Sequence, residues 1–379
     1  MADIKLHIVS FAIPDPPDYG GIIDVFYKIK YLAEAGVKIY LHCSQYDERL
    51  PSAVLESWCE KVWYYPRHTG VAGLSMTLPY IVYSRRGTDI LNNLQAIDAP
   101  ILFDGLSTAY YLDHPALRSR LKILRPQNVE QDYYRLLAKR TRHSVKRLYY
   151  TAEALLLKRL ENRLNNVDVF FTVAQHDHEF FRKKYPVASH HYLPSFQPYT
   201  EITSQEGSGD FTLYHGNLSV EENEEAALFL LEQVCSQTDT PLYIAGKNPT
   251  VRLLRTAKKF PHCAVIANPD KLQMEELIAQ AHIHVLPTFQ STGLKLKLLH
   301  GLFNGRHVLV NEEMLTGTGL QHVCHIASDA TGFAQKIKEL MKVPFTKAEI
   351  LRRKAILMNH YDNRKNAAAI VTYLQQRSL

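Results

Sequence analysis

The sequence predicts an α/β protein made of two Rossmann-like domains, each built on a parallel sheet. Short apolar runs alternate with amphipathic stretches through the first half, and the same alternation starts again after residue 210. Such alternation is the pattern of a parallel sheet with crossover helices. Between the halves lies QPYTEITSQEGSGD (197–210), a polar segment typical of a linker. We therefore expect domains at residues 1–195 and 205–355, followed by a helix at residues 361–379.

Length, charge and cysteine content agree with a soluble cytoplasmic protein. The 379 residues suffice for two cores, and no stretch approaches the roughly 20 apolar residues of a membrane span. Met1 to Lys5 leads directly into a strand pattern, so no signal peptide is expected. The five scattered cysteines contain no C-x-x-C pair, which predicts reduced thiols and neither a disulfide framework nor a zinc site. The net charge of +6 is too small to imply nucleic acid.

The first half opens with a β-α-β pattern. A strand begins at Ile4 in IKLHIVSFAIP, and the following PDYGG predicts a sharp turn in which Gly20 and Gly21 adopt positive φ. A helix is expected over Ile22–Ala35, stopped by Gly36, and VKIYLHCS is the second strand. The glycine pair fits a close approach to a ligand and a plain turn equally well.

Further strands are predicted at KVWYYP and APILFDG, with the amphipathic YIVYSRRGTDILNNL between them. Asp104 falls at the end of the second of these strands. DVFFTVAQHDHEFFRKKYP then supplies a strand and a helix that close the first domain. The predicted order completes a Rossmann-like sheet.

A basic, tyrosine-rich stretch at 135–163 stands out from the rest of the first half. Its cations are opposed by few acids and are Arg135, Lys139, Arg140, Arg142, Lys146, Arg147, Lys158, Arg159 and Arg163. Long amphipathic helices of this composition are typical of peripheral binding to anionic lipid, here at the inner face of a membrane. A solvated helix face explains the same charges equally well. No nucleic-acid recognition motif accompanies them.

The second half repeats the alternation, and its polar residues fall where strands end. The strands expected there lie in FTLYHGNL, TPLYIAGKNP, CAVIANP and HIHVLPT. Ligands of parallel sheets sit beyond the carboxyl ends of the strands. The residues predicted at these ends are Gly216, Asn217, Lys247, Asn248, Asn268 and Gly293.

The stretch STGLKLKLLHGLFNGRHVLVN (291–311) predicts a turn, a mostly buried helix and a buried strand. An apolar arc of leucines leaves a narrow polar stripe of Gly293, Lys297, His300 and Asn304, and Gly305 is expected as a left-handed stop. Lysines in the first turn oppose the helix dipole unless an anion binds there, and the expected anion is a phosphate. An ordinary buried helix with a satisfied histidine is the alternative.

These residues resemble GT-B glycosyltransferases like those of family 4. The resemblance rests on the Thr-Gly turn, Lys297 and the Gly-Arg before an apolar strand, and on RPQNVEQDYY, which is similar to an R-x-H-N-V-E-x-x-Y-Y segment with Gln127 in place of histidine. Thr292 and His300 occupy the two positions of the family's E-x7-E glutamates. The resemblance implies parallel sheets that face a cleft and a terminal helix that crosses back to the first domain.

The resemblance also implies a retaining transfer of a sugar from a nucleoside diphosphate donor to a glycan or lipid-linked acceptor in polysaccharide biosynthesis. No metal or other cofactor is expected, since cations and helix termini can neutralise the departing diphosphate. Lys297 and Lys247 are the candidates for that role, and Glu130 or Asp104 would orient the acceptor. The expected donor-binding residues are Gly20, Gly21, Gly216, Asn217, Lys247, Asn248, Asn268, Thr292, Gly293, Leu294, Lys295, Lys297 and His300.

Two alternatives stay open. A degraded transferase that binds without turnover is suggested by Thr292, His300 and Gln127, which replace the family's two glutamates and its histidine. A nucleotide-sugar 2-epimerase would share the fold, although its acidic and histidine residues have no match here. Turnover in the presence of an acceptor, or donor interconversion without one, distinguishes these classes.

Overall fold

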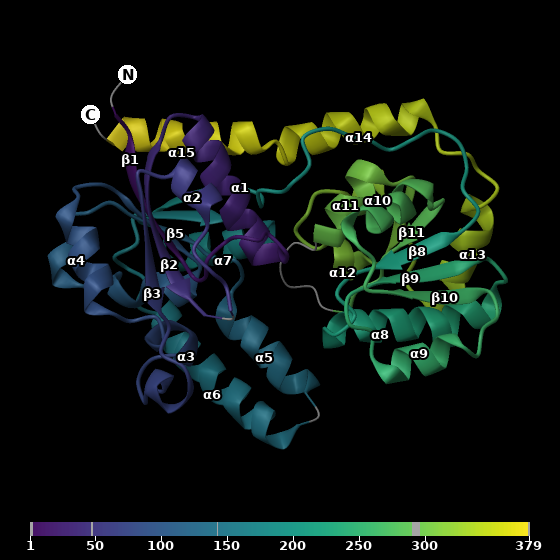
Figure 1. Cartoon of the computed structure of the whole chain (residues 1–379), viewed down its shortest axis with the longest axis horizontal. Coiled ribbons are helices and arrows are strands. Elements are labelled where there is room, and N and C mark those ends of the chain that lie inside the picture. The colour runs from purple at the N-terminus through teal and green to yellow at the C-terminus, as the bar shows by residue number, and fades with distance from the viewer. Residues whose placement is uncertain (1–2, 47, 142, 290–295, 378–379) are drawn as a thin grey trace. The chain divides into compact units, whose positions relative to one another are not determined.

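The computed structural model describes residues 3–46, 48–141, 143–289 and 296–377. The chain forms two compact units, each a parallel sheet covered by helices (Figure 1). The N-terminal unit comprises Met1–Pro198 with Tyr361–Leu379, and the C-terminal unit comprises Tyr199–His360. The predicted fold class of two Rossmann-like domains is confirmed.

The sheet of the N-terminal unit has the strand order β3-β2-β1-β4-β5-β6-β7, with every neighbouring pair parallel. Its central strands are almost wholly buried, which explains their near-continuous apolar sequences. The strands are β1 (Lys5–Ser10), β2 (Lys38–Gln45), β3 (Lys61–Pro66), β4 (Ile101–Asp104), β5 (Lys122–Arg125), β6 (Val169–Thr172) and β7 (Ser189–Tyr192).

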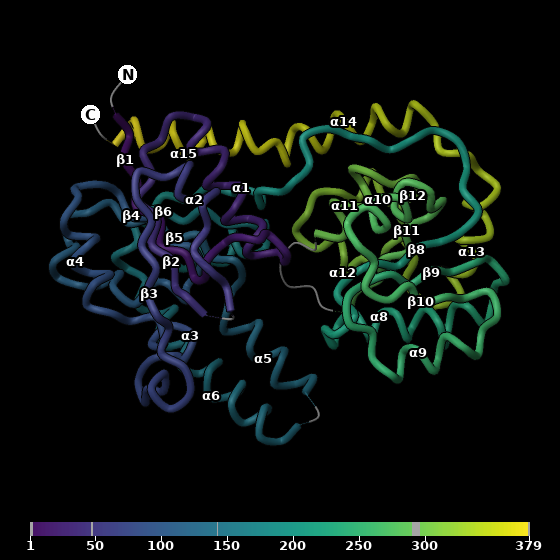
Figure 2. The backbone as a smooth tube through the Cα atoms, viewed as in Figure 1, coloured from purple at the N-terminus to yellow at the C-terminus, as the bar shows by residue number. Residues whose placement is uncertain are grey.

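Helices cover both faces of this sheet and make a core on each. They are α1 (Gly20–Glu34), α2 (Ala53–Trp58), α3 (Tyr80–Tyr83), α4 (Thr88–Ala96), α5 (Glu130–Arg140), α6 (Ser144–Glu161), α7 (Gln175–Lys184) and α15 (Asn363–Arg377). The last of these returns to the N-terminal unit as expected. Ile370 and Leu374 of α15 join the core that holds Val25 and Ile29 of α1, and Figure 2 shows the two helices side by side.

The sheet of the C-terminal unit has the order β10-β9-β8-β11-β12-β13 and is also parallel throughout. Its strands are β8 (Thr212–His215), β9 (Leu242–Gly246), β10 (Cys263–Ala267), β11 (Ile283–Val285), β12 (His307–Val310) and β13 (His325–Ile326). Its helices are α8 (Glu221–Phe229), α9 (Val251–Ala257), α10 (Lys271–Gln280), α11 (Leu296–Asn304), α12 (Glu312–Leu315), α13 (Ala330–Leu340) and α14 (Lys347–His360). A π turn (Leu230–Val234) and the 3₁₀ turn η5 (Cys235–Gln237) prolong α8.

The positive φ predicted for Gly20 and Gly21, and the left-handed conformation predicted for Gly305, are wrong. Gly20 and Gly21 are the first residues of α1 and do not adopt positive φ, whereas Gly36 after α1 does, at φ +83°. A Cβ on Gly21 would lie 3.0 Å from Cζ of Phe11, so this glycine serves a close approach. Gly305 after α11 is not in the left-handed region either. A Cβ there would lie 1.9 Å from Nε2 of His284, so the buried imidazole requires this glycine.

Candidate functional site

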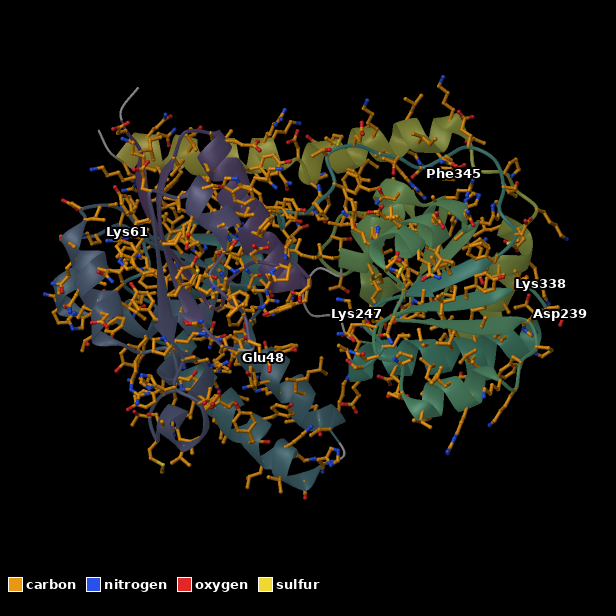
Figure 3. All side chains as sticks on the ribbon, viewed as in Figure 1. Glu48, Lys61, Asp239, Lys247, Lys338 and Phe345 are labelled. Carbon is orange, nitrogen blue, oxygen red and sulfur yellow. The ribbon has the colours of Figure 1, made fainter. Side chains whose placement is uncertain are left out.

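Polar loops leave the C-terminal unit at the carboxyl ends of β8, β9 and β10. Because these strands are parallel and adjacent, their loops meet at one edge of the sheet. The loops touch backbone to backbone: a Cβ on Gly246 would lie 1.7 Å from the carbonyl oxygen of Gly216. Lys247 is exposed directly after β9, as Figure 3 shows. The predicted strand-end residues in the described part of the chain therefore share one edge.

Three predicted asparagines shape this edge. Asn248 and Asn268 adopt left-handed φ of +51° and +52°, which asparagine tolerates better than most residues. The backbone N–H of Asn248 donates to Oδ1 of Asn268 at 2.7 Å. Oδ1 of Asn217 accepts from the backbone N–H and from the hydroxyl of Ser219. The side chains of Asn217 and Asn268 are thus engaged in holding the loops.

Helix α11 presents Lys297 to the same part of the unit. Leu298, Leu299, Leu302 and Phe303 on its apolar face are fully buried. Lys297, His300 and Asn304 on the other face are half-buried. Nζ of Lys297 donates to the hydroxyl of Tyr214 at 2.9 Å and to Oδ1 of Asn223 at 2.6 Å, and it lies 4.9 Å from the centre of the Tyr214 ring. Strand β8 and helix α8 therefore help to fix the position of the ammonium group.

Four predicted donor-binding residues lie outside the described residues. They are Thr292, Gly293, Leu294 and Lys295, which precede α11. Their contacts stay predictions.

Aromatic rings pack around His300, in the middle of α11. The His300 ring stacks on Tyr199 with centres 5.1 Å apart and meets the His215 ring edge-on at 5.4 Å. Burial lowers the pKa of His300 to about 4, so the ring is neutral at pH 7. Burial also holds the pKa of His215 well below its usual value, and Nε2 of His215 has no hydrogen-bond partner within the described ranges. Neutral rings of this kind suit hydroxyl groups better than phosphate.

In the N-terminal unit the structure places Asp104, a candidate for orienting the acceptor, inside the protein. Asp24, Lys28, Asp104 and Arg125 form a buried charge network whose side chains are all fully buried. Arg125 donates to both carboxylate oxygens of Asp24, at 2.8 and 2.7 Å, and Lys28 pairs with both acids. Asp104 is therefore held inside the unit, where it pairs with Lys28.

Glu130 has a different environment at the start of α5. Burial, followed by the nearby carboxyls of Glu161 and Asp177, raises the pKa of Glu130 to about 8. Burial likewise raises the pKa of Glu161 to about 7 and that of Asp177 to about 6. A carboxyl that titrates near neutral pH is suited to proton exchange with a substrate, and such groups gather at functional sites.

Sequence reasoning missed the residues that hold Lys297. Tyr214 lies in an apolar strand, and Asn223 is the only amide in the acidic segment EENEE (221–225), so neither stands out as a partner of a lysine. Tyr199 and His215 were also missed, since their contact with His300 joins positions about 100 and 85 residues apart.

Within the described residues, none of the helices combines the length and the apolar content that crossing a bilayer requires.

The sequence of the C-terminal unit is similar to a known protein family. Residues 210–343 match the family model described as glycosyl transferases group 1. An uncharacterised 44.6 kDa protein in the cps region of Klebsiella pneumoniae is 24% identical over 97% of this chain and 98% of its own length. The resemblance predicted from the sequence is thereby confirmed for the C-terminal unit.

Solved structures share the fold across nearly the whole chain. Anabaena HepE in complex with UDP and glucose has a TM-score of 0.65 at 10% identity, covering 98% of this chain and 100% of that one. TarM of S. aureus, in a complex that includes UDP, has a TM-score of 0.67 at 7% identity, with 98% and 99% covered. The pneumococcal O-GlcNAc transferase GtfA with UDP and GlcNAc has a TM-score of 0.62 at 8% identity, with 99% of each covered. The chain therefore has the GT-B fold of these structures, and its residues 210–343 are similar to group 1 glycosyl transferases.

Proposed function

We propose that this chain transfers a sugar from a nucleoside diphosphate donor to a glycan or lipid-linked acceptor, with retention of configuration and without a metal ion or other cofactor. The observation that carries the proposal is the position of Lys297. Its ammonium group is fixed by Tyr214 and Asn223 at the N-terminal turn of α11, where the helix dipole also favours an anion.

The largest charge that develops in such a reaction is on the departing diphosphate. A pre-positioned cation stabilises this charge without reorganising at the moment of transfer. Lys297 fills that role, and the exposed Lys247 at the same sheet edge is the second candidate. His300 and His215, as neutral rings, would bind ribose or sugar hydroxyls.

Glu130 is our candidate for the acceptor. In a front-face reaction the leaving phosphate itself takes the proton of the acceptor hydroxyl, so no protein base is obligatory. A carboxyl with a pKa of about 8 can donate or accept a hydrogen bond at neutral pH and so orient that hydroxyl. We do not assign this role to Asp104, because its side chain is fully buried.

UDP-sugars are the donors to test first, because HepE, GtfA and TarM were all solved with UDP. Thermal shift with UDP and GDP, followed by UDP release in the presence of candidate glycans, tests the proposal. Product NMR reads the configuration, and a chelator tests the metal independence. Binding without turnover would identify a degraded transferase, and donor interconversion without acceptor would identify an epimerase. Either result contradicts the proposal.

We also propose that helices α5 and α6 contact an anionic membrane at the cytoplasmic face. They border an open groove of about 480 Å³ lined by Arg135, Ala138, Lys139, Arg147, Thr151, Ala154 and Leu155. Val145 and Leu148 on α6 are 79% and 73% exposed, so cations and apolar side chains share this surface. Leu148→Glu should weaken sedimentation with phosphatidylserine vesicles, while Val187→Glu, at a fully exposed valine on another surface, should not. Equal behaviour of the two variants would exclude this contact.

A further inference from the structure

Two cysteines and a histidine come together at the amino end of the C-terminal sheet. Cys235 begins the turn η5, Cys263 begins strand β10, and His262 precedes it. The two Sγ atoms are 3.1 Å apart, and one ring nitrogen of His262 lies within 4.8 Å of both. The two cysteines are 28 positions apart in the sequence, so their spacing gave no sign of this cluster.

The cluster is partly shielded from solvent, and one of its polar atoms has no partner among the described residues. Cys235 is only 4% exposed, and His262 and Cys263 are half-buried. Nε2 of His262 is buried and has no hydrogen-bond partner among the residues that the structure describes. Buried polar atoms nearly always have a partner, and a bound ion is one way to supply it.

We propose that Cys235, His262 and Cys263 bind a thiophilic divalent cation, for which Zn²⁺ is the natural candidate. On binding, each thiol loses a proton to solvent, two metal–sulfur bonds and one metal–nitrogen bond form, and a water molecule completes a tetrahedron. Zinc–sulfur bonds of about 2.3 Å separate two sulfurs by about 3.8 Å at the tetrahedral angle, so the thiol pair must open by about 0.7 Å. Two thiolates neutralise the charge of the ion.

A second cluster in the same unit is less suited to a cation. Nδ1 of His307 lies 3.2 Å from Nε2 of His325 and 3.6 Å from Oε1 of Glu349. Nε2 of His307 bonds the carbonyl oxygen of Val343, so these imidazoles already have protein partners. The guanidinium group of Arg353 also acts on both histidines as a nearby positive charge. A variant of this histidine cluster, His325→Gln, is therefore a suitable control for the thiol cluster.

The position of the thiol cluster gives the metal a structural role. Figure 3 labels Asp239, which precedes β9, and Lys247, which follows it, at opposite ends of that strand. The cluster lies at the Asp239 end, whereas the proposed donor site lies at the Lys247 end. The metal would link the turn η5, which follows α8, to the edge strand β10. This inference is independent of the proposed sugar transfer.

The test uses the reduced, chelator-treated full-length chain. One equivalent of Zn²⁺ should bind, release about two protons and raise the melting temperature. Co²⁺ should give a sulfur-to-cobalt charge-transfer band that Zn²⁺ abolishes. Cys263→Ser and His262→Gln should each weaken Zn²⁺ binding by about 100-fold or more, since removing even an outer partner of a ligand costs 10- to 100-fold. Cys59→Ser and His325→Gln should bind as wild type does.

Proton release and the cobalt spectrum are read on the wild type, so a variant that fails to fold does not spoil the test. The proposal is overturned if the wild type retains no stoichiometric Zn²⁺, if cobalt binds without a charge-transfer band, or if His325→Gln rather than Cys263→Ser abolishes binding. A chain that only forms a Cys235–Cys263 disulfide in air, with no zinc bound when reduced, overturns it equally.

Discussion

The two units share an architecture but use their charged side chains differently. In the N-terminal unit the buried charge network neutralises itself inside the protein, with no exposure of any member. In the C-terminal unit Lys297 is half-buried at a helix N-terminus and bonds the neutral groups of Tyr214 and Asn223. The first set of charges stabilises the fold, and Lys297 is the group that we propose to bind the donor's diphosphate.

The difference has an energetic consequence. Removing one member of a buried ion pair leaves its partner uncompensated in a medium of low dielectric constant, which is strongly destabilising. Removing a half-buried cation costs less stability, and it would take away the interaction that we propose with the donor's diphosphate. Charge substitutions should therefore change unfolding in the N-terminal unit and binding in the C-terminal unit.

The largest effect is expected for Asp24→Asn. The variant leaves the buried Arg125 and Lys28 without a full countercharge, so the free energy of unfolding should fall by about 3 to 5 kcal/mol. Urea denaturation followed by circular dichroism measures it. Asp98→Asn is the matched control, because Asp98 is 95% exposed in its pair with Arg120 and should cost less than about 1 kcal/mol. Similar losses in both variants would contradict the comparison.

A pH-dependent stability effect is expected for Glu130→Gln. Between the ordinary glutamate pKa of about 4.3 and the raised value of about 8, folded Glu130 holds a proton that the unfolded chain has lost. Wild-type stability therefore falls as pH rises through this window. The variant lacks this proton and should gain about 2 to 4 kcal/mol on wild type between about pH 5 and pH 8, as measured by urea denaturation at each pH. Parallel pH profiles would show that Glu130 ionises normally.

Lys297→Ala should act on binding. It should weaken nucleoside diphosphate binding by about 1.5 to 3 kcal/mol while affecting the free nucleoside less, because a charge-assisted hydrogen bond to phosphate is lost. Calorimetric titration with UDP and uridine measures both. Tyr214→Phe keeps the ring and the lysine and should show a smaller loss for UDP. An equal loss for UDP and uridine in Lys297→Ala would mean that the lysine does not touch phosphate.

The smallest effect concerns His300→Asn. With a pKa of about 4, His300 stays neutral between about pH 5.5 and 8.5, so UDP affinity of wild type and variant should follow parallel curves over that range. Comparing the two proteins cancels the titration of the phosphate itself. Curves that converge as pH rises would show that bound phosphate charges the imidazole. A loss of melting temperature without a change in affinity would make His300 a core residue.

Much of the fold followed from local patterns. The alternation of apolar runs and amphipathic stretches predicted the two parallel sheets, and the terminal helix was predicted to return to the N-terminal unit. Strand β5 was missed, because its four residues, KILR, begin and end with a cation, Lys122 and Arg125. Arg125 fits a buried strand only because Asp24, about 100 positions earlier, pairs with it.

The sequence by itself determined the chain order of the elements, the strand ends that carry polar residues and the polar stripe of α11, because side-chain periodicity and turn chemistry act over a few residues. Only the tertiary structure decided which of these polar groups are available to a ligand. It buried Asp104, raised the pKa of Glu130, made His300 neutral and brought Cys235 to Cys263. Desolvation and charge pairing depend on residues that are distant along the chain, and no local pattern records them.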